Sequence, residues 1–193
     1  VNMALAAQRP VEKVMIIVVT SDRGLCGGYN SNLIKLAKQV MKDKYAAQHA
    51  KGNVQILPIG TKGYEHFTKT GHKVESKYWD IFSGLSFEKV QAAAKHVMDA
   101  FANKEIDAVE LIYSEFKNAA TQRFVTEQFL PVQKVDKVEG QKNADFIFEP
   151  GKDVLIAELM PKILNTQLFK ATLDGNASEH GARMTAMDKA SDN

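Results

Sequence analysis

The sequence contains a single cysteine, Cys26, among its 193 residues. One cysteine excludes an internal disulfide, and it excludes any metal site or dithiol switch that needs a pair of thiols within the chain. This cysteine usage is compatible with a reducing compartment. No apolar run approaches the roughly 18 residues that a membrane-spanning helix needs, and no signal-peptide pattern is visible. The sequence therefore does not predict direct insertion into a membrane.

Charge of one sign is not in excess, because 25 lysines and arginines stand against 23 aspartates and glutamates, which leaves a net charge of +2. No block of basic residues is long enough to form a polybasic patch. The charge balance therefore gives no support for a nucleic-acid partner. Hydrophobic residues make up 45% and charged residues 25% of the chain, as in ordinary globular proteins. The length suffices for one domain with a sizeable core.

The two ends of the sequence are unusual. The chain begins with Val1 rather than methionine, and it stops at Asn193 in a stretch that still has a helical pattern. No glycine or proline marks a helix end there. We expect the sequence to be a piece of a longer protein.

The most informative segment runs from Val14 to Asn30. Six apolar residues, Val14–Val19, predict a strand that is buried on both faces. A charged, glycine-rich turn follows at residues 23–28, and Asn30 or Ser31 is suited to cap the helix that comes next. A strand, a tight turn and a helix in this order open an α/β sheet.

Further along the chain, strand and helix patterns alternate. The sequence predicts strands at 14–19, 54–59, 73–79, 107–116 and 124–132, and helices at 29–49, 64–68 and 87–101. Ser86 is suited to cap the last of these helices, with Glu88 in its first turn. Pro131 marks an edge strand or a strand end. Residues 135–142 are expected to form a loop, followed by a short apolar piece at 146–148. This order predicts a Rossmann-like α/β fold with an open, mostly parallel sheet and helices on both faces.

After Gly151 the character of the sequence changes. Residues 1–152 are expected to form the α/β domain and residues 153–193 one long helix, capped by Asp153 and kinked or restarted at Pro161. About 40 helical residues would span about 60 Å, and so long a helix needs a partner along its apolar face. Gly175 and Gly181 each cost roughly 1 kcal/mol relative to alanine, which indicates local weakness or close packing.

The glycine-rich turn is the main candidate for chemistry. Residues 23–28 match neither G-x-G-x-x-G nor the Walker loop. A phosphate resting on the following helix with help from Arg23 remains an alternative, but a tight turn with closely packed glycines is favoured. Asp22 follows the strand, where it can pair with Arg23 or cap the turn. Cys26 has no histidine motif beside it and no metal-ligand cluster is present, so the sequence predicts no catalytic residue, no cofactor and no metal.

Two long segments resemble a known family. Residues 21–30 are similar to the signature turn of the gamma subunit of F-type ATP synthases, and residues 177–193 are similar to its long C-terminal helix. Residues 59–63 and 148–150 also resemble the family's sequence at the corresponding positions. The resemblance implies a non-catalytic central rotor shaft, in which N- and C-terminal helices form an antiparallel coiled coil inside a hexamer of alternating alpha and beta subunits. It implies a Rossmann-like foot domain against the epsilon subunit and the membrane c-ring.

In this family, proton flow turns the c-ring and the asymmetric shaft changes the affinities of the catalytic sites on the beta subunits. The resemblance implies a peripheral position at the cytoplasmic face of the bacterial inner membrane. It makes Arg183, Met184 and Met187 candidate contacts with the hexamer, and Phe148 and Glu149 candidate contacts with the c-ring. The N-terminal shaft helix and the end of the C-terminal helix have no counterpart here, so we expect a foot domain with the lower shaft.

Two departures and two alternatives accompany the resemblance. The regulatory cysteine pair of the photosynthetic form has no counterpart, and Gly181 stands where the family commonly has alanine.

One alternative is a nucleotide-binding α/β enzyme that uses the loop Gly24–Gly28. The other is an adaptor that self-associates through the C-terminal helix, with Leu164, Leu168 and Met184 pairing with a second copy.

Overall fold

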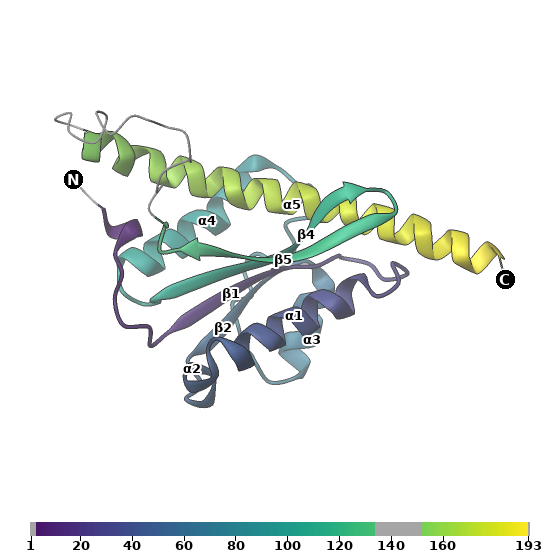
Figure 1. Ribbon diagram of the computed structural model, residues 1–193, viewed down its shortest axis with the longest axis horizontal. Helices are drawn as coiled ribbons and strands as arrows, with labels where there is room; N and C mark the ends of the chain where they lie inside the picture. Colours follow the sequence, from purple (N-terminus) through teal and green to yellow (C-terminus); the bar gives the residue numbers. More distant parts are fainter. Residues whose placement is uncertain (1–2, 134–151, 193) are drawn as a thin grey trace.

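A five-stranded sheet lies at the centre of the chain, in the order β3-β2-β1-β4-β5. The computed structural model describes residues 3–133 and 152–192 (Figure 1). The strands are β1 (Val14–Val19), β2 (Val54–Ile59), β3 (Lys73–Val74), β4 (Ala108–Asn118) and β5 (Thr121–Leu130). All neighbouring pairs are parallel except β4 and β5, which are antiparallel. The predicted α/β class with an open, mostly parallel sheet is confirmed.

Helices cover both faces of this sheet (Figure 1). They are the 3-10 helix η1 (Ala4–Ala6) and the α-helices α1 (Tyr29–Asp43), α2 (Ala46–Ala50), α3 (Thr61–Lys69), α4 (Phe87–Ala102) and α5 (Lys152–Asp192). Met15, Ile17 and Val19 of β1 share a core with α4 and α5, whereas the alternate residues of β1 share a core with α1 and α3. Because side chains alternate across a strand, both faces of β1 are apolar, which explains its unbroken hydrophobic run.

The long helix α5 has 41 residues and contains Pro161 without restarting there. Proline cannot donate a backbone hydrogen bond. Met160 and Leu164, on either side of the proline, are buried, so packing keeps the helix continuous where that bond is missing. Leu164, Leu168 and Ala171 belong to the same core as β1 and α4. The first part of α5 therefore packs on the sheet, and its last turns extend past the β4–β5 hairpin (Figure 1).

The predicted helix 29–49 is wrong in its continuity. It is broken at Lys44 and Tyr45, between α1 and α2. The Tyr45 hydroxyl donates a hydrogen bond of 2.8 Å to the buried carboxylate of Glu110 on β4, and the Lys44 ammonium pairs with the same carboxylate. A buried carboxylate is costly unless it is paired and hydrogen-bonded, so we attribute the break to this contact.

The predicted side-chain cap of α1 is also wrong. Gly28 is the residue before α1, and no side chain caps the helix. The Asn30 amide instead accepts a hydrogen bond from the Ser21 backbone amide at 2.9 Å and donates to the Ser21 hydroxyl at 2.8 Å. The Ser31 hydroxyl donates to the Gly28 carbonyl at 3.0 Å. These polar side chains therefore fix the loop rather than the helix end.

The short elements differ in length from their predictions. Only Lys73 and Val74 form β3, an edge strand, so the predicted strand 73–79 is too long. Trp79 stacks on Tyr64 of α3 with ring centroids 4.9 Å apart. The helix predicted around 64–68 is the longer α3. Gly63 is part of α3. Thr20 side-chain atoms lie 3.0 Å from where a Cβ of residue 63 would be, so a larger residue would crowd Thr20.

Helix α4 confirms its prediction closely. Ser86 precedes it, and the Ser86 hydroxyl accepts a hydrogen bond from the Lys89 backbone amide at 3.3 Å. Glu88 lies in its first turn. The edge strand β5 ends just before Pro131, as predicted. The predictions for residues 135–142 and 146–148 lie outside the described residues, as does the side chain of Asp153.

Candidate functional site: the glycine-rich corner and its contact with α5

The carboxyl ends of β1 and β2 form the edge where open α/β sheets bind ligands. The Asp22 carboxylate occupies the N-terminus of α3, where it accepts hydrogen bonds from the Thr61 backbone amide at 3.0 Å and the Thr61 hydroxyl at 3.1 Å. The next two amides of α3 donate to the Ser21 carbonyl at 3.0 Å and to the Thr20 hydroxyl at 2.9 Å. The helix terminus that would hold a phosphate is therefore satisfied by the chain itself.

The loop after Asp22 is a tight corner. Leu25 and Gly27 both have positive φ, of 62° and 61°. The Cys26 side chain is only 3% exposed, and its sulfur lies 3.5 Å from the Asn30 amide nitrogen. The sequence left open whether Cys26 is exposed or packed, and the structure shows that it is packed. Its surroundings do not indicate a nucleophile, because the contacts of its sulfur come from Ser21, Arg23 and Asn30.

This corner is bound to α5. The Arg183 guanidinium donates to the Gly24 carbonyl at 3.3 Å and to the Arg23 carbonyl at 3.3 Å, and it pairs with the Glu179 carboxylate at 2.7 Å. The Arg183 and Glu179 side chains are only 12% and 9% exposed. Arginine therefore joins a loop near the start of the chain to a helix near its end, in surroundings that exclude most water.

A second contact joins the same elements. The Tyr29 hydroxyl donates a hydrogen bond of 2.9 Å to the Gly175 carbonyl of α5. Burial, with smaller contributions from Glu179 and Cys26, raises the pKa of Tyr29, so the phenol stays protonated and remains a donor. Tyr29 is 2% exposed. Tyr29 is therefore a residue of the core.

The two glycines of α5 explain how the helix comes so close. A Cβ at Gly175 would lie 3.0 Å from a methyl carbon of Val19, and a Cβ at Gly181 would lie 2.5 Å from the Ala119 carbonyl oxygen at the β4–β5 turn. Of the two readings that the sequence left open, close packing is confirmed at both positions. The pair Glu179–Arg183 and the residues Tyr29, Gly175 and Gly181 together are called the α5 joint below.

The residues predicted to contact partners differ in how exposed they are. Arg183 is part of the α5 joint, and Met184 and Met187 are 59% and 51% exposed. Phe148 and Glu149 lie outside the described residues. The proposed self-association surface is wrong in two of its three residues, because Leu164 and Leu168 are 1% and 0% exposed and pack against the sheet.

An apolar face of α5 remains uncovered in the described part of the chain. Its large exposed residues are Leu155, Leu159, Ile163, Leu173, Met184 and Met187. At about 100° per residue, their positions fall within a sector about 120° wide, so they share one side of the helix. Leu155 and Leu159 were not among the predicted contact residues, although the spacing of four residues along Leu155, Leu159 and Ile163 was a usable signal.

Neither metal binding nor membrane crossing is indicated by the residues that the structure describes. Among residues 3–133 and 152–192, no group of histidine, cysteine, aspartate and glutamate side chains is arranged to hold a metal ion. Within the same ranges, no helix combines the length and hydrophobicity needed to cross a bilayer.

The role of the loop can be tested at Gly27. No atom lies within 4 Å of where its Cβ would be, so substitution adds backbone strain without a clash. We expect Gly27→Val to destabilise the chain by about 1–3 kcal/mol, because a β-branched residue at positive φ is strained. Urea unfolding followed by circular dichroism measures this loss. Tight ATP binding by the parent chain that Gly27→Val abolishes, with stability unchanged, would instead indicate a ligand loop.

The fold and the site together define a class of protein. It is an α/β sheet domain whose ligand-binding edge is occupied by its own Asp22 side chain, and to which a long helix is fixed. The family model described as ATP synthase matches residues 1–193, the whole chain. The chain belongs to the ATP synthase gamma chain family, and the resemblance noted in the sequence is confirmed.

Sequence relatives agree with this assignment, and a solved structure shares the fold. The chain is 45% identical to the ATP synthase gamma chain of Cytophaga hutchinsonii, with 97% of this chain and 65% of the relative covered. It is 47% identical to that of Flavobacterium johnsoniae, with 100% of this chain and 65% of the relative covered. The chain thus spans about two thirds of the length of these relatives. The central stalk of the Tetrahymena thermophila mitochondrial ATP synthase shares the fold, with a TM-score of 0.65 and 22% identity over 96% of this chain and 79% of that chain.

Proposed function

We propose that the chain is part of the central stalk of a proton-translocating ATP synthase. It couples rotation of the c-ring to conformational change in the catalytic beta subunits, and it catalyses no reaction itself. The observation that carries the proposal is the α5 joint, which fixes a 41-residue helix to the sheet domain. A shaft can transmit torque only if it does not turn or slide in its base.

The details of the joint support a mechanical role. Gly175 and Gly181 allow backbone-close contacts with β1 and with the β4–β5 turn, and Arg183 binds two carbonyls of the corner loop. These contacts reach three separate segments of the sheet domain: β1, the β4–β5 turn and the corner loop. Tightly packed interiors transmit strain because they are not easily compressed.

We assign the parts of the chain accordingly. Residues 1–152 form the foot domain, and residues 153–193 form the lower part of the shaft. The part of the exposed apolar face of α5 at Leu155, Leu159, Ile163 and Leu173 packs against an antiparallel shaft helix, because a helix of this length needs a partner along such a face. The chain lies peripherally at the cytoplasmic face of the bacterial inner membrane as part of the complex.

Partner contacts follow from this arrangement. The foot contacts the epsilon subunit and the c-ring, the latter through Phe148 and Glu149. The alpha and beta subunits contact the shaft through Met184 and Met187, whereas Arg183, a third candidate from the sequence, is largely buried in the α5 joint and holds this part of the helix on the corner loop. Exposed methionines at the protruding end of α5 support this assignment, since methionine adapts to irregular apolar surfaces.

The competing reading, a nucleotide-binding enzyme that uses the loop Gly24–Gly28, has little support. The N-terminus of α3 is filled by the Asp22 carboxylate, and two carbonyls of the loop accept hydrogen bonds from Arg183. A nucleotide phosphate at this edge would have to displace a carboxylate of the same charge.

The proposal is tested by binding to the assembled alpha and beta subunits of the same organism. We expect the chain to be retained by this assembly, and the double substitution Met184→Glu and Met187→Glu to weaken binding by at least about tenfold. The matched control is Leu155→Glu, which places a charge on the same face of α5 at its other end and leaves binding within about twofold. Affinity is measured by biolayer interferometry.

Either of two results would contradict the proposal. One is failure of the unsubstituted, folded chain to bind the assembly. The other is an equal loss of affinity in the Leu155→Glu control, which would show that any charge on the face disturbs α5 and that the methionines make no specific contact.

A further inference from the structure

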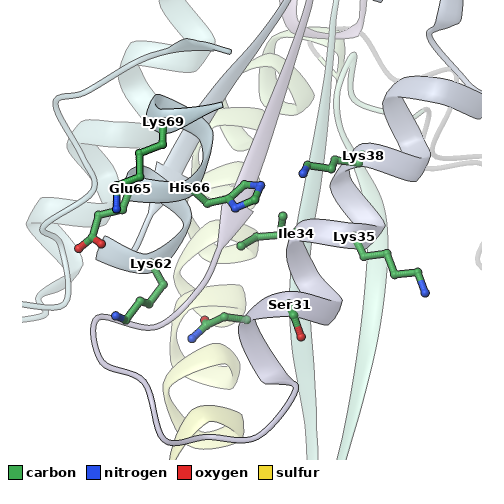
Figure 2. Close-up of a pocket in the computed structure, with 9 residues that line it drawn as sticks. Ser31, Ile34, Lys35, Lys38, Lys62, Glu65, His66 and Lys69 are labelled. Atoms are coloured by element: carbon green, nitrogen blue, oxygen red, sulfur yellow. The ribbon is translucent and has the colours of Figure 1, made fainter. Parts of the chain in front are cut away.

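A groove of about 580 Å³ lies between α1 and α3, on the face of the sheet opposite α5 (Figure 2). Ile34 of α1 lies between the two helices, and polar side chains from both helices surround it. The volume falls within the range of about 300–1,000 Å³ that small-molecule sites occupy. This groove is separate from the α5 joint and uses none of its side chains.

Positive charge is concentrated around the groove. Lys35 and Lys38 of α1 and Lys62 and Lys69 of α3 line it, against one carboxylate, Glu65. None of these four lysines forms an ion pair with a carboxylate in the part of the chain that the structure describes. Figure 2 shows Glu65 and Lys35 pointing away from the space between the helices and Lys38 pointing into it, so the centre of the groove faces a cation and no carboxylate. The whole chain has a net charge of only +2, which makes the local excess distinctive.

Two donors converge at the centre of the groove. Lys38 and His66 point toward each other across it (Figure 2). The His66 Nε2 atom is buried and has no hydrogen-bond partner among the described residues. A buried polar atom without a partner is costly, so a hydrogen-bond partner for His66 in this pocket would be stabilising.

We propose that the α1–α3 groove binds a compact phosphate-bearing small molecule, with Lys38 and His66 as the central contacts. Protonated imidazole and ammonium are donors only, which requires a ligand rich in acceptors and negative charge. Convergence of two donors on one point favours a compact group over an extended acidic peptide, which would need a row of cations. Charge-assisted hydrogen bonds to phosphate are among the strongest in proteins.

The protonation of His66 makes this binding sensitive to pH. Burial, and then the nearby charge of Lys38, lower the pKa of His66. The other groups around it are Lys35 of α1, Lys62, Glu65 and Lys69 of α3, and His72. An anion between Lys38 and His66 favours the charged imidazole and raises its pKa. Binding is therefore tighter at about pH 6 than at about pH 8.

The test is a titration of the full chain with inorganic pyrophosphate, followed by two-dimensional NMR. We expect saturable shifts in the backbone amides of α1 and α3 and in the His66 ring, and an affinity that falls from about pH 6 to about pH 8. Lys38→Gln and His66→Gln are each expected to weaken binding by at least about tenfold. Lys189→Gln, which removes the same charge at the exposed end of α5, leaves the affinity unchanged.

Distinct outcomes would overturn the proposal. Absence of saturable shifts would show that the groove does not bind pyrophosphate. An equal loss of affinity in Lys38→Gln and Lys189→Gln would show only a general attraction of anions. Binding of an acidic glutamate peptide without binding of pyrophosphate would assign the groove to a polypeptide partner. Unchanged amide spectra of the variants outside the groove confirm that they are folded.

Discussion

Replacing Gly175 with leucine is expected to lower the free energy of unfolding by about 3 kcal/mol. A Cβ at this position would already lie 3.0 Å from a methyl carbon of Val19. Val19 belongs to β1, which is paired on both sides, so the strand has no room to move away. The larger side chain must lift α5, which also breaks the hydrogen bond from the Tyr29 hydroxyl to the Gly175 carbonyl.

Urea unfolding followed by circular dichroism measures this loss. The matched control is Ala190→Leu, which also introduces a leucine side chain, at an exposed position of α5, and is expected to change stability by less than about 0.5 kcal/mol. Leucine has a better helix propensity than glycine, by up to about 1 kcal/mol. A stabilised Gly175→Leu variant would therefore show that propensity, and not contact with β1, dominates at this position.

Substituting Arg183 with methionine is expected to cost about 3 kcal/mol. The change removes the hydrogen bonds to the Arg23 and Gly24 carbonyls and leaves the Glu179 carboxylate buried without its partner. Most of the cost arises from that unpaired carboxylate, because a buried charge without a partner is strongly unfavourable. The effect is measured by urea unfolding of the same chain.

A double-mutant cycle separates the two causes. If the unpaired carboxylate dominates, Glu179→Gln in the Arg183→Met background recovers part of the stability, and the coupling energy reaches about 1–3 kcal/mol. Lys189→Met, on the exposed last turn of α5, serves as the control and is expected to be neutral. Additive effects of Arg183→Met and Glu179→Gln would mean that the ion pair contributes nothing to the joint and that the loop carbonyls account for its strength.

Local patterns in the sequence were sufficient to predict β1 and the start of α4. The run Val14–Val19 predicted β1 with its bounds, because both faces of that strand are buried and need apolar residues. Ser86 predicted the start of α4, because a capping hydroxyl acts on an amide only three residues away. Predictions of this kind depend on neighbours in the chain, which the sequence contains directly.

Predictions failed where a distant side chain decides the local structure. The break between α1 and α2 depends on Glu110, which is 65 residues from Tyr45. The side chain of Asn30 satisfies Ser21 rather than the helix terminus, since the corner loop brings the two together. The spacing of Leu164 and Leu168 fits an exposed helix face that pairs with a second copy as well as a face buried in the core. Their burial depends on which side of α5 meets the sheet.

The candidate site was predictable in its position but not in its contacts. The sequence indicated that the turn at residues 23–28 is a close-packed corner and that Gly175 and Gly181 are unusual in a helix. It gave no sign that the corner and the glycines contact each other. The hydrogen bond from Tyr29 to Gly175 joins residues 146 positions apart, and that from Arg183 to Gly24 joins residues 159 positions apart.

The sequence by itself determined the fold class, the long C-terminal helix and the family, because hydrophobic periodicity and a specific motif are properties of neighbouring residues. The tertiary structure alone decided that the ligand edge is closed by Asp22, that α5 is fixed to the corner loop, and that Lys38 and His66 meet across a groove. These features depend on contacts between segments far apart in the chain. Such contacts exist only once the sheet has brought those segments together.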